Sequence, residues 1–219
     1  MLRKISVFIR RKFRSHFKNI ISRKDIEILK DKNFVIVSDN CWGGSLYQWY
    51  KRPYNSPFIG LRIYGDCYLK LLSNFDFYLK QNITFIKKSK YPDREIVYPL
   101  GLLGDIEIHF THYKTEAEVL KKWRRRTDRM LEEINKDNYF FKMCTAVSAD
   151  VKDLEKFHEL PFKNKISFSS NKLDTVKSNY HIKVNQHHGK DKTKLPNGKK
   201  LFKLTFLYFD LNKWLLNKD

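Results

Sequence analysis

The chain has 219 residues, 42% of them hydrophobic and 15% aromatic, so it is long enough and apolar enough to bury the core of a folded domain, which argues against disorder. Lysine and arginine outnumber aspartate and glutamate by 44 to 24, which indicates an anionic partner such as a phosphorylated substrate, an anionic lipid or a nucleic acid. Three cysteines without CxxC spacing argue against a disulfide framework or a structural zinc site and favour a cytoplasmic compartment.

Residues 1–24 form a basic segment that differs from the rest of the chain. It contains nine lysines and arginines and no acidic residue. Its apolar residues recur at spacings of three and four, which places them on one face of a helix: Leu2, Ile5, Ile9, Phe13, Phe17 and Ile20. A basic amphipathic helix of this kind is typical of proteins that lie on an anionic membrane surface. We therefore expect a peripheral position on the inner membrane face, with packing of this helix onto the domain as the alternative.

The first strand is predicted from four consecutive apolar residues, Phe34 to Val37, three of which are β-branched. A polar turn with two glycines follows at residues 38–45. In open α/β sheets, binding and catalytic sites form at the carboxyl ends of strands, where the loops border a crevice. The active site is therefore expected at this turn.

Predicted helices and strands alternate through the rest of the chain. The expected helices cover residues 46–50, 65–81, 115–134 and 150–158. The expected strands after the first cover residues 58–63, 83–86, 105–110, 139–144, 165–168, 181–184 and 201–208. The third helix begins at a capping box, because Thr115 is followed three residues later by Glu118. Residues 96–104 are too rich in glycine for regular structure, and residues 185–200 are expected to form a polar loop.

Short apolar strands that alternate with helices predict an α/β fold. The expected architecture is a three-layer α/β/α sandwich, with a mostly parallel sheet and helices on both faces. Residues 25–219 show no internal repeat and no second-domain boundary, so a single domain is expected after the basic segment. Neither a GxGxxG motif nor a P-loop motif is present, which excludes the standard dinucleotide and P-loop sites at the level of motifs.

Two residues of the turn are candidate nucleophiles. Cys41 would be reactive if a helix N-terminus or a nearby histidine lowered the pKa of its thiol. The alternative is an inert cysteine buried beside Trp42, because free cysteines are usually buried. Ser38, at the end of the strand, is the second candidate nucleophile.

His109 and His112 close the strand that begins at Asp105, and they are the candidate general acid or base. They would share a sheet edge with the turn if the strands are parallel. Asp105 is expected either to orient a histidine or to form a salt bridge with the basic helix. With an oxygen ligand from Asp105, Glu107 or Asp39, the histidines would also suit a metal ion, although His-x-x-His is a common spacing. Hydrogen-bonded structural histidines are the alternative.

The candidate substrate-binding residues lie in three segments. Asn40 and the amides around Gly43 and Gly44 would form an oxyanion or phosphate cradle, unless the glycines only serve the turn. The rim of the pocket is expected at Tyr54, Asn55 and Ser56. The helix from residue 115 carries four arginines that suit a phosphate or a sugar-nucleotide diphosphate, or else form a solvated face: Arg124, Arg125, Arg126 and Arg129. Of these four arginines, Arg125 is the one expected to bind the substrate.

Four stretches together resemble the bacterial domain-of-unknown-function family 1919. They are Ser-Asp-Asn-Cys-Trp-Gly-Gly at 38–44, residues 54–61, Tyr-Pro-Leu-Gly-Leu-Leu-Gly-Asp-Ile-Glu-Ile-His-Phe-Thr-His-Tyr at 98–113, and residues 160–165. The resemblance covers roughly residues 30 to 170, and it implies an α/β fold and a setting in exopolysaccharide or capsule biosynthesis. It assigns no catalytic residue. The strand that ends in an Asn-Cys turn also resembles the start of capsule acyltransferases that bind coenzyme A. Those proteins usually have Gly-Asn-Cys-Gln at this turn, whereas this chain has Asp-Asn-Cys-Trp at residues 39–42.

These features together favour a transferase that modifies a glycan at the cytoplasmic face of the membrane. The expected donor is of coenzyme A type or a sugar nucleotide, and the transferred group is acyl or similar. An esterase-type hydrolase that uses Ser38 or Cys41 is one alternative, and a non-catalytic membrane-associated scaffold is another. Nucleic-acid binding is expected least, because only the charge supports it.

Overall fold

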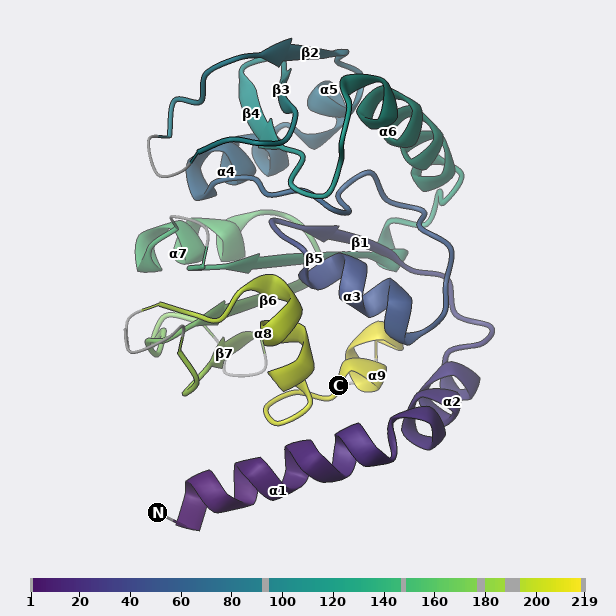
Figure 1. The fold of residues 1–219 in the computed structure, drawn as a ribbon, viewed down its shortest axis with the longest axis vertical. Helices are drawn as coiled ribbons and strands as arrows, with labels where there is room; N and C mark the ends of the chain where they lie inside the picture. Colours follow the sequence, from purple (N-terminus) through teal and green to yellow (C-terminus); the bar gives the residue numbers. More distant parts are fainter. Residues whose placement is uncertain (1, 92–94, 147–148, 177–179, 188–193, 218–219) are drawn as a thin grey trace.

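Helices and strands alternate along the chain, which makes the protein an α/β protein, as the sequence predicts (Figure 1). The computed structural model describes residues 2–91, 95–146, 149–176, 180–187 and 194–217. Residues 188–193 of the expected polar loop lie outside these ranges.

The central sheet has four strands, all parallel, in the order β1-β5-β6-β7. These strands are β1 (Val35–Ser38), β5 (Tyr139–Cys144), β6 (Asn164–Ser169) and β7 (His181–Lys183). A short 3-10 helix, η1 (Lys136–Asn138), precedes β5, and α7 (Val151–Glu159) connects β5 to β6. Every residue of β1 and β5 is buried, because helices cover both faces of the sheet.

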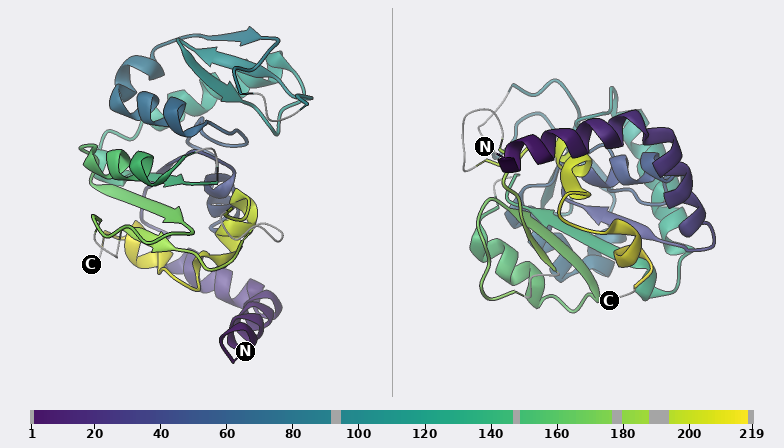
Figure 2. Two further views of the ribbon diagram at one scale, coloured as in Figure 1. Left: turned by 90° about the vertical axis from the view of Figure 1, so that its left-hand side faces the viewer. Right: turned by 90° about the horizontal axis from the view of Figure 1, so that it is seen from below.

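Two hydrophobic clusters lie on the two faces of this sheet. Successive side chains of a strand point to opposite faces, so Val35 and Val37 enter one cluster and Ile36 enters the other. The first cluster includes side chains of α4 (Gly65–Ser73) and of α7. The second face is covered by α3 (Trp42–Trp49), α8 (Gly198–Thr205) and α9 (Leu211–Leu215). The parallel sheet therefore forms the middle of three layers (Figures 1 and 2).

A second, antiparallel sheet lies beyond α4 (Figure 1). Its strands, in the order β2-β3-β4, are β2 (Ile83–Ile86), β3 (Leu100–Leu103) and β4 (Ile106–His109). The adjoining helices are α5 (Phe75–Leu79) and α6 (Glu116–Leu131). Ile106 and Ile108 of β4 share one hydrophobic cluster with Val35 and Val37 of β1, so the two sheets have a common core. The strand at 105–110 is confirmed, but it does not belong to the parallel sheet.

The basic N-terminal segment is helical, in two pieces, α1 (Leu2–His16) and α2 (Lys18–Ile28), and α2 continues past residue 24. Four apolar side chains of α1 are 50–60% exposed: Ile5, Phe8, Ile9 and Phe13. Two arginines of α1 contact the domain: the guanidinium of Arg14 lies 4.3 Å from the ring centre of Trp49 and 4.6 Å from that of Phe206, and the guanidinium of Arg10 lies 5.9 Å from the ring centre of Phe206. Arg14 also lies 3.7 Å from the carboxylate of Asp25 in α2. Figures 1 and 2 show that α1 lies along the end of the molecule opposite the antiparallel sheet. None of the described helices combines the length and apolar character needed to cross a membrane.

The segment at 201–208, predicted as a strand, is largely the helix α8. Asn197 caps this helix, because its Oδ1 accepts a hydrogen bond from the Lys200 amide at 3.0 Å. Leu201, Leu204 and Thr205 are buried at helical spacing. The strand prediction was wrong because a short apolar run fits both periods.

Two further expectations differ from the structure. Residues 58–63 form no strand, and Gly60 within them has a φ of +78°. Their place in the fold is to join the two sheets: the amide of Ile63 donates to the Asp39 carbonyl at 3.0 Å, and that of Arg62 donates to the His109 carbonyl at 2.8 Å. Residues 96–104, expected to be irregular, contain β3.

The helix expected at 65–81 is divided. Asn74 interrupts it with a φ of −138° and a ψ of 52°, so that α4 and α5 are separate helices. Strands β2 and β5 have the expected bounds, and the other expected helices and strands are present with shifted ends.

Candidate active site

A cleft of about 1150 Å³ opens at the carboxyl ends of β1 and β5. Its walls come from the turn between β1 and α3, from residues 59–62, from residues 111–113, from the start of α8 and from side chains of α6. The position agrees with the rule that sites in α/β sheets form where the strands end. The cleft is large enough for a cofactor-sized ligand.

Cys41 and His112 meet in this cleft. Cys41 directly precedes α3, and its Sγ lies 3.1 Å from Nε2 of His112. His112 follows β4, and its amide donates to the carbonyl of Gly60 at 3.0 Å, which holds the loop against the segment that joins the two sheets. A thiol and an imidazole at this distance have the geometry that a nucleophile–base pair requires.

The Cys41 thiol is half-buried. Burial raises the pKa of this thiol above its ordinary value, and a hydrogen bond with Thr111 and the charges of Arg62 and Lys142 only partly oppose the change. The thiol is therefore protonated at neutral pH, and a reaction through Cys41 would require a base such as His112 to accept its proton.

The turn places backbone amides beside Cys41. Oδ1 of Asn40 accepts a hydrogen bond from the Trp42 amide at 3.1 Å and so caps the first turn of α3. Gly44 lines the cleft, whereas Gly43 packs on the sheet, where an added Cβ would lie 3.0 Å from Cβ of Ser38. The Gly43 position therefore requires glycine for close approach, and Gly44 brings the first turn of α3 to the wall of the cleft.

Ser38 is fully buried and does not line the cleft. Its Oγ donates to the carbonyl of Asn40 at 3.0 Å, which closes the turn. The candidate nucleophile Ser38 is thus a structural residue of the turn.

A buried ion pair between Lys142 of β5 and Asp39 holds the turn that follows β1. Nζ of Lys142 lies 2.7 Å from Oδ1 of Asp39, 3.2 Å from Oδ1 of Asn40 and 3.0 Å from Sγ of Cys144. The other oxygen of Asp39 accepts from the Cys144 amide at 3.0 Å. Burial, followed by the charge of Asp39, raises the pKa of Cys144 to about 11, so this thiol stays protonated.

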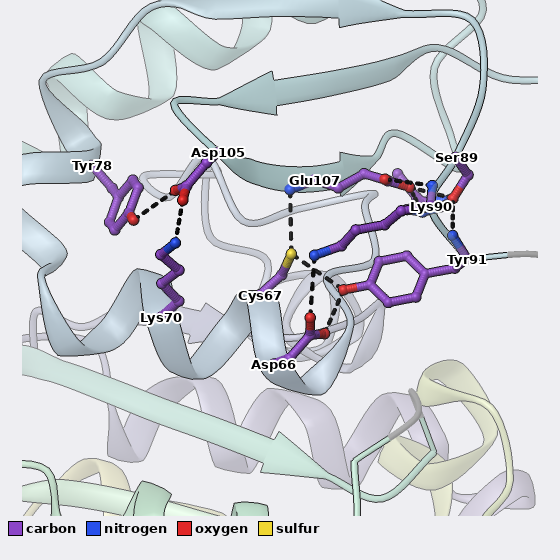
Figure 3. A network of polar contacts seen from close by, with 10 residues as sticks. Asp66, Cys67, Lys70, Tyr78, Ser89, Lys90, Tyr91, Asp105 and Glu107 are labelled. Atoms are coloured by element: carbon purple, nitrogen blue, oxygen red, sulfur yellow. Dashed lines mark hydrogen bonds and ion pairs between the residues drawn. The ribbon is translucent and has the colours of Figure 1, made fainter.

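His109 points away from Cys41 and is 2% exposed. Its Nε2 lies 2.7 Å from Oε1 of Glu107, and its Nδ1 lies 3.1 Å from the hydroxyl of Tyr98. Figure 3 shows that Glu107 is also held by the Ser89 hydroxyl and by the Lys90 amide, the latter at 3.0 Å. The two candidate histidines are therefore separated: only His112 reaches the cleft.

Asp105 lies outside the cleft, where it forms an ion pair with Lys70 and accepts a hydrogen bond from the Tyr78 hydroxyl at 2.8 Å (Figure 3). It orients neither histidine, and its partner belongs to α4 instead of the basic helix α6. In the described ranges, no group of three or more His, Cys, Asp or Glu side chains could hold a metal ion.

Of the three residues expected at the rim, only Tyr54 lines the cleft. Asn55 donates through Nδ2 to the carbonyl of Phe34 at 3.0 Å, and Ser56 donates to the carbonyl of Ile36 at 2.6 Å. These two side chains attach the loop to β1 and to the residue just before it, and they do not line the cleft.

On α6, the cleft is lined by Arg126 and not by Arg125, which is exposed. The helical period carries the signal that the sequence analysis missed. Val119, Trp123 and Met130 face inward, and Arg126 stands at the i+7 position from the first of them. Lys122, one turn before Arg126, also lines the cleft.

Comparisons with known proteins agree with the resemblance carried by the motifs. The chain matches the family described as "Domain of unknown function (DUF1919)" over residues 12–216. It is also 36% identical over 180 residues to an "Uncharacterized protein" of Haemophilus influenzae, an alignment that covers 82% of this chain and 81% of that protein. The family match extends well beyond residues 30–170 and includes the residues that line the cleft.

Proposed function

We propose that this chain, which belongs to the DUF1919 family, is a transferase that moves an acyl group onto a hydroxyl of a surface polysaccharide. The observation that carries the proposal is the pair of Cys41 and His112 at the start of α3, in a cleft that has room for a donor and a sugar. The polysaccharide setting is supported only by the resemblance of the motifs around residues 38–44 and 98–113.

The proposed reaction has two steps. His112 accepts the proton of the Cys41 thiol while Sγ attacks the donor carbonyl, and the imidazolium then returns this proton to the leaving group. In the second step His112 accepts the proton of the acceptor hydroxyl, whose oxygen attacks the new thioester. The carbon–sulfur bond breaks, and the imidazolium returns the proton to Cys41. The amide of Gly44 donates to the carbonyl oxygen in both steps.

The proposal is tested with p-nitrophenyl acetate, an activated acyl donor whose reaction does not depend on the natural one. We expect a burst of about one equivalent of p-nitrophenol per chain and a stable acetyl group on Cys41, because the thioester awaits an acceptor. The burst is measured by absorbance, and the acetyl group by intact mass and peptide mapping. Cys41→Ser should show neither, whereas Cys67→Ser, which changes a buried cysteine outside the cleft, should show both.

The outcomes separate the proposed enzyme from its alternatives. Steady release of p-nitrophenol without an acceptor, lost in Cys41→Ser, would indicate a hydrolase. If no acetyl group forms on Cys41, the transferase proposal is wrong.

The second part of the proposal places the protein on the cytoplasmic face of the membrane, held there by α1. The exposed side chains of Phe8 and Phe13 supply apolar area, and cations such as Arg11 and Lys12 lie on the same helix. An amphipathic helix of this kind binds through its buried apolar area and through attraction to anionic headgroups. Ile9 and Phe13 border a hollow together with Phe206 of the domain, but they stay 58% and 60% exposed and so remain accessible for this role.

Vesicle binding tests this placement. The wild-type chain is expected to sediment with phosphatidylglycerol vesicles at low salt, and binding should fall by at least about tenfold in the double variant Phe8→Gln/Phe13→Gln. Phe77→Gln is the control, because Phe77 is 50% exposed on another helix. Equal binding of the double variant and the wild type would contradict the role of α1. A scaffold without enzymatic activity would bind vesicles but form no acyl-enzyme.

A further inference from the structure

We infer that the cleft binds the diphosphate group of an organic donor, the chemistry shared by coenzyme A and nucleoside-diphosphate sugars, with Arg126 at the centre of this site. The inference rests on the proposed function for the reaction that the donor serves. The binding itself is a property of the cleft, and it is measurable without any turnover.

The lining of the cleft carries charge of one sign. Five lysines and arginines of the described chain line it, and none of its described lining residues is an aspartate or glutamate: Arg62, Lys122, Arg126, Lys194 and Lys199. Arg62, Arg126 and Lys199 form no ion pair with any carboxylate in the described ranges. A concave surface with this arrangement concentrates anions.

Arg126 is the strongest element of this arrangement, because its side chain is buried without a counter-ion. The residue is only 6% exposed. Its Nη1 donates to the hydroxyl of Tyr113 at 2.6 Å and to the carbonyl of Ile59 at 3.3 Å, both neutral acceptors, and its buried Nε has no acceptor. The ring of Tyr54 lies 4.9 Å from Cζ. A buried charge is costly unless it is paired, so a bound anion would supply the missing partner.

The second element is the meeting of two helix N-termini at the cleft. Gly198 opens α8, and an added Cβ there would lie 2.7 Å from the Trp42 amide, so α8 starts directly against the start of α3. Both helix starts line the cleft, through Gly44 of α3 and through Asn197 and Gly198 at α8. Two positive dipole ends placed together repel each other, and an anion between them removes this cost.

The two elements lie on separate walls, which favours a diphosphate over a single phosphate. Arg126 and Lys122 come from α6, whose inward side chains belong to the cluster on one face of the parallel sheet, whereas the paired helix starts come from α3 and α8, which cover the other face. A bridging diphosphate presents oxygens to both walls. The rest of a nucleotide or coenzyme A has room in the 1150 Å³ cleft, where the rings of Tyr64 and Tyr98 also line the wall.

Calorimetric titration of the full chain with inorganic pyrophosphate tests the inference. We expect saturable binding to the wild type, weakened by about 10- to 100-fold in Arg126→Gln, because charge-assisted hydrogen bonds to the anion are lost. Arg125→Gln is the matched control: it removes the same charge from the neighbouring, exposed position and should bind as the wild type does. If Arg126→Gln does not fold, Lys199→Gln, which changes an exposed side chain of the cleft, is expected to weaken binding in the same direction.

Further titrations with ADP, UDP and coenzyme A identify the source of the diphosphate, which is the ligand that binds more tightly than pyrophosphate. Absence of pyrophosphate binding at millimolar concentration would overturn the inference, and so would equal weakening by Arg125→Gln and Arg126→Gln. Failure here is distinguishable from failure of the proposed reaction. Cys41→Ser should bind pyrophosphate normally while forming no acetyl-enzyme, so each experiment stands without the other.

Discussion

Replacing Asp39 by asparagine is expected to destabilise the folded chain by about 3–5 kcal/mol, because it leaves a buried ammonium without its carboxylate. The side chains of Lys142 and Asp39 are 0% and 2% exposed, and their charged atoms lie 2.7 Å apart. Burial alone would lower the pKa of Lys142. The interactions with Asp39 and Cys144 outweigh this effect, so the pKa ends above its ordinary value. The Lys142 ammonium is therefore charged at neutral pH, and the stability that its raised pKa contributes is lost as pH rises from the ordinary lysine value through that raised pKa.

Urea unfolding at pH 7 measures the effect, with Lys142→Met expected to be about as harmful as Asp39→Asn. The double variant Asp39→Asn/Lys142→Met should recover part of the loss, since it leaves no buried charge unpaired. Asp105→Asn is the control, because it removes a carboxylate from an exposed ion pair with Lys70 and should change stability little. Strictly additive losses in the double variant would show that the two side chains do not act as a pair.

The sequence predicts much of this fold because most elements carry their own signal. The capped helix α6, the apolar strand β5 and the strand β4 all lie where their periods and caps place them. Which strands pair could not be predicted in the same way. Apolar and polar residues alternate in β4 as they do in many strands, which does not show its partner. It belongs to an antiparallel sheet because it pairs with β3, which forms despite Gly101. An added Cβ at that glycine would lie 2.8 Å from the ring of Phe110, so the glycine is a packing residue here.

The site was predicted in part, and for an incorrect reason. Cys41 and His112 were expected to meet at the edge of one parallel sheet, but β4 belongs to the other sheet. They meet because residues 58–63 bridge the two sheets through Ile63 and Arg62, a long-range contact that no local pattern encodes.

The burial of two charged residues was not predicted, although both had a signal in the sequence. Lys142 interrupts the apolar run of β5, and a lysine inside such a strand requires a buried partner. Arg126 lies on the inward face of α6 set by Val119 and Met130. The sequence alone leaves Arg126 open between a phosphate contact and a solvated face and makes no assignment for Lys142, whereas the structure buries both side chains.

Loss of the His112 imidazole is expected to slow acylation of Cys41 by about 100-fold or more at pH 7, as is usual for removal of a general base. Burial raises the pKa of the Cys41 thiol, so the free thiolate is scarce at neutral pH. In the wild type the proton passes to Nε2 of His112, 3.1 Å away, so the rate should not depend on the scarce free thiolate and should rise less steeply with pH. In His112→Asn the rate should instead rise about tenfold per pH unit, up to the raised pKa of the thiol.

The pre-steady-state rate of p-nitrophenol release, followed from pH 5 to 10, distinguishes these profiles. His16→Asn is the control, because His16 is an exposed histidine of α1 and does not line the cleft. It should keep both the rate and the profile of the wild type. A fold effect would lower the rate at every pH by the same factor, whereas loss of a base changes the shape of the curve and is partly overcome at high pH. The dyad is contradicted if His112→Asn follows the wild-type curve, and in that case Cys41 reacts as an isolated thiol whose rate is set by its burial alone.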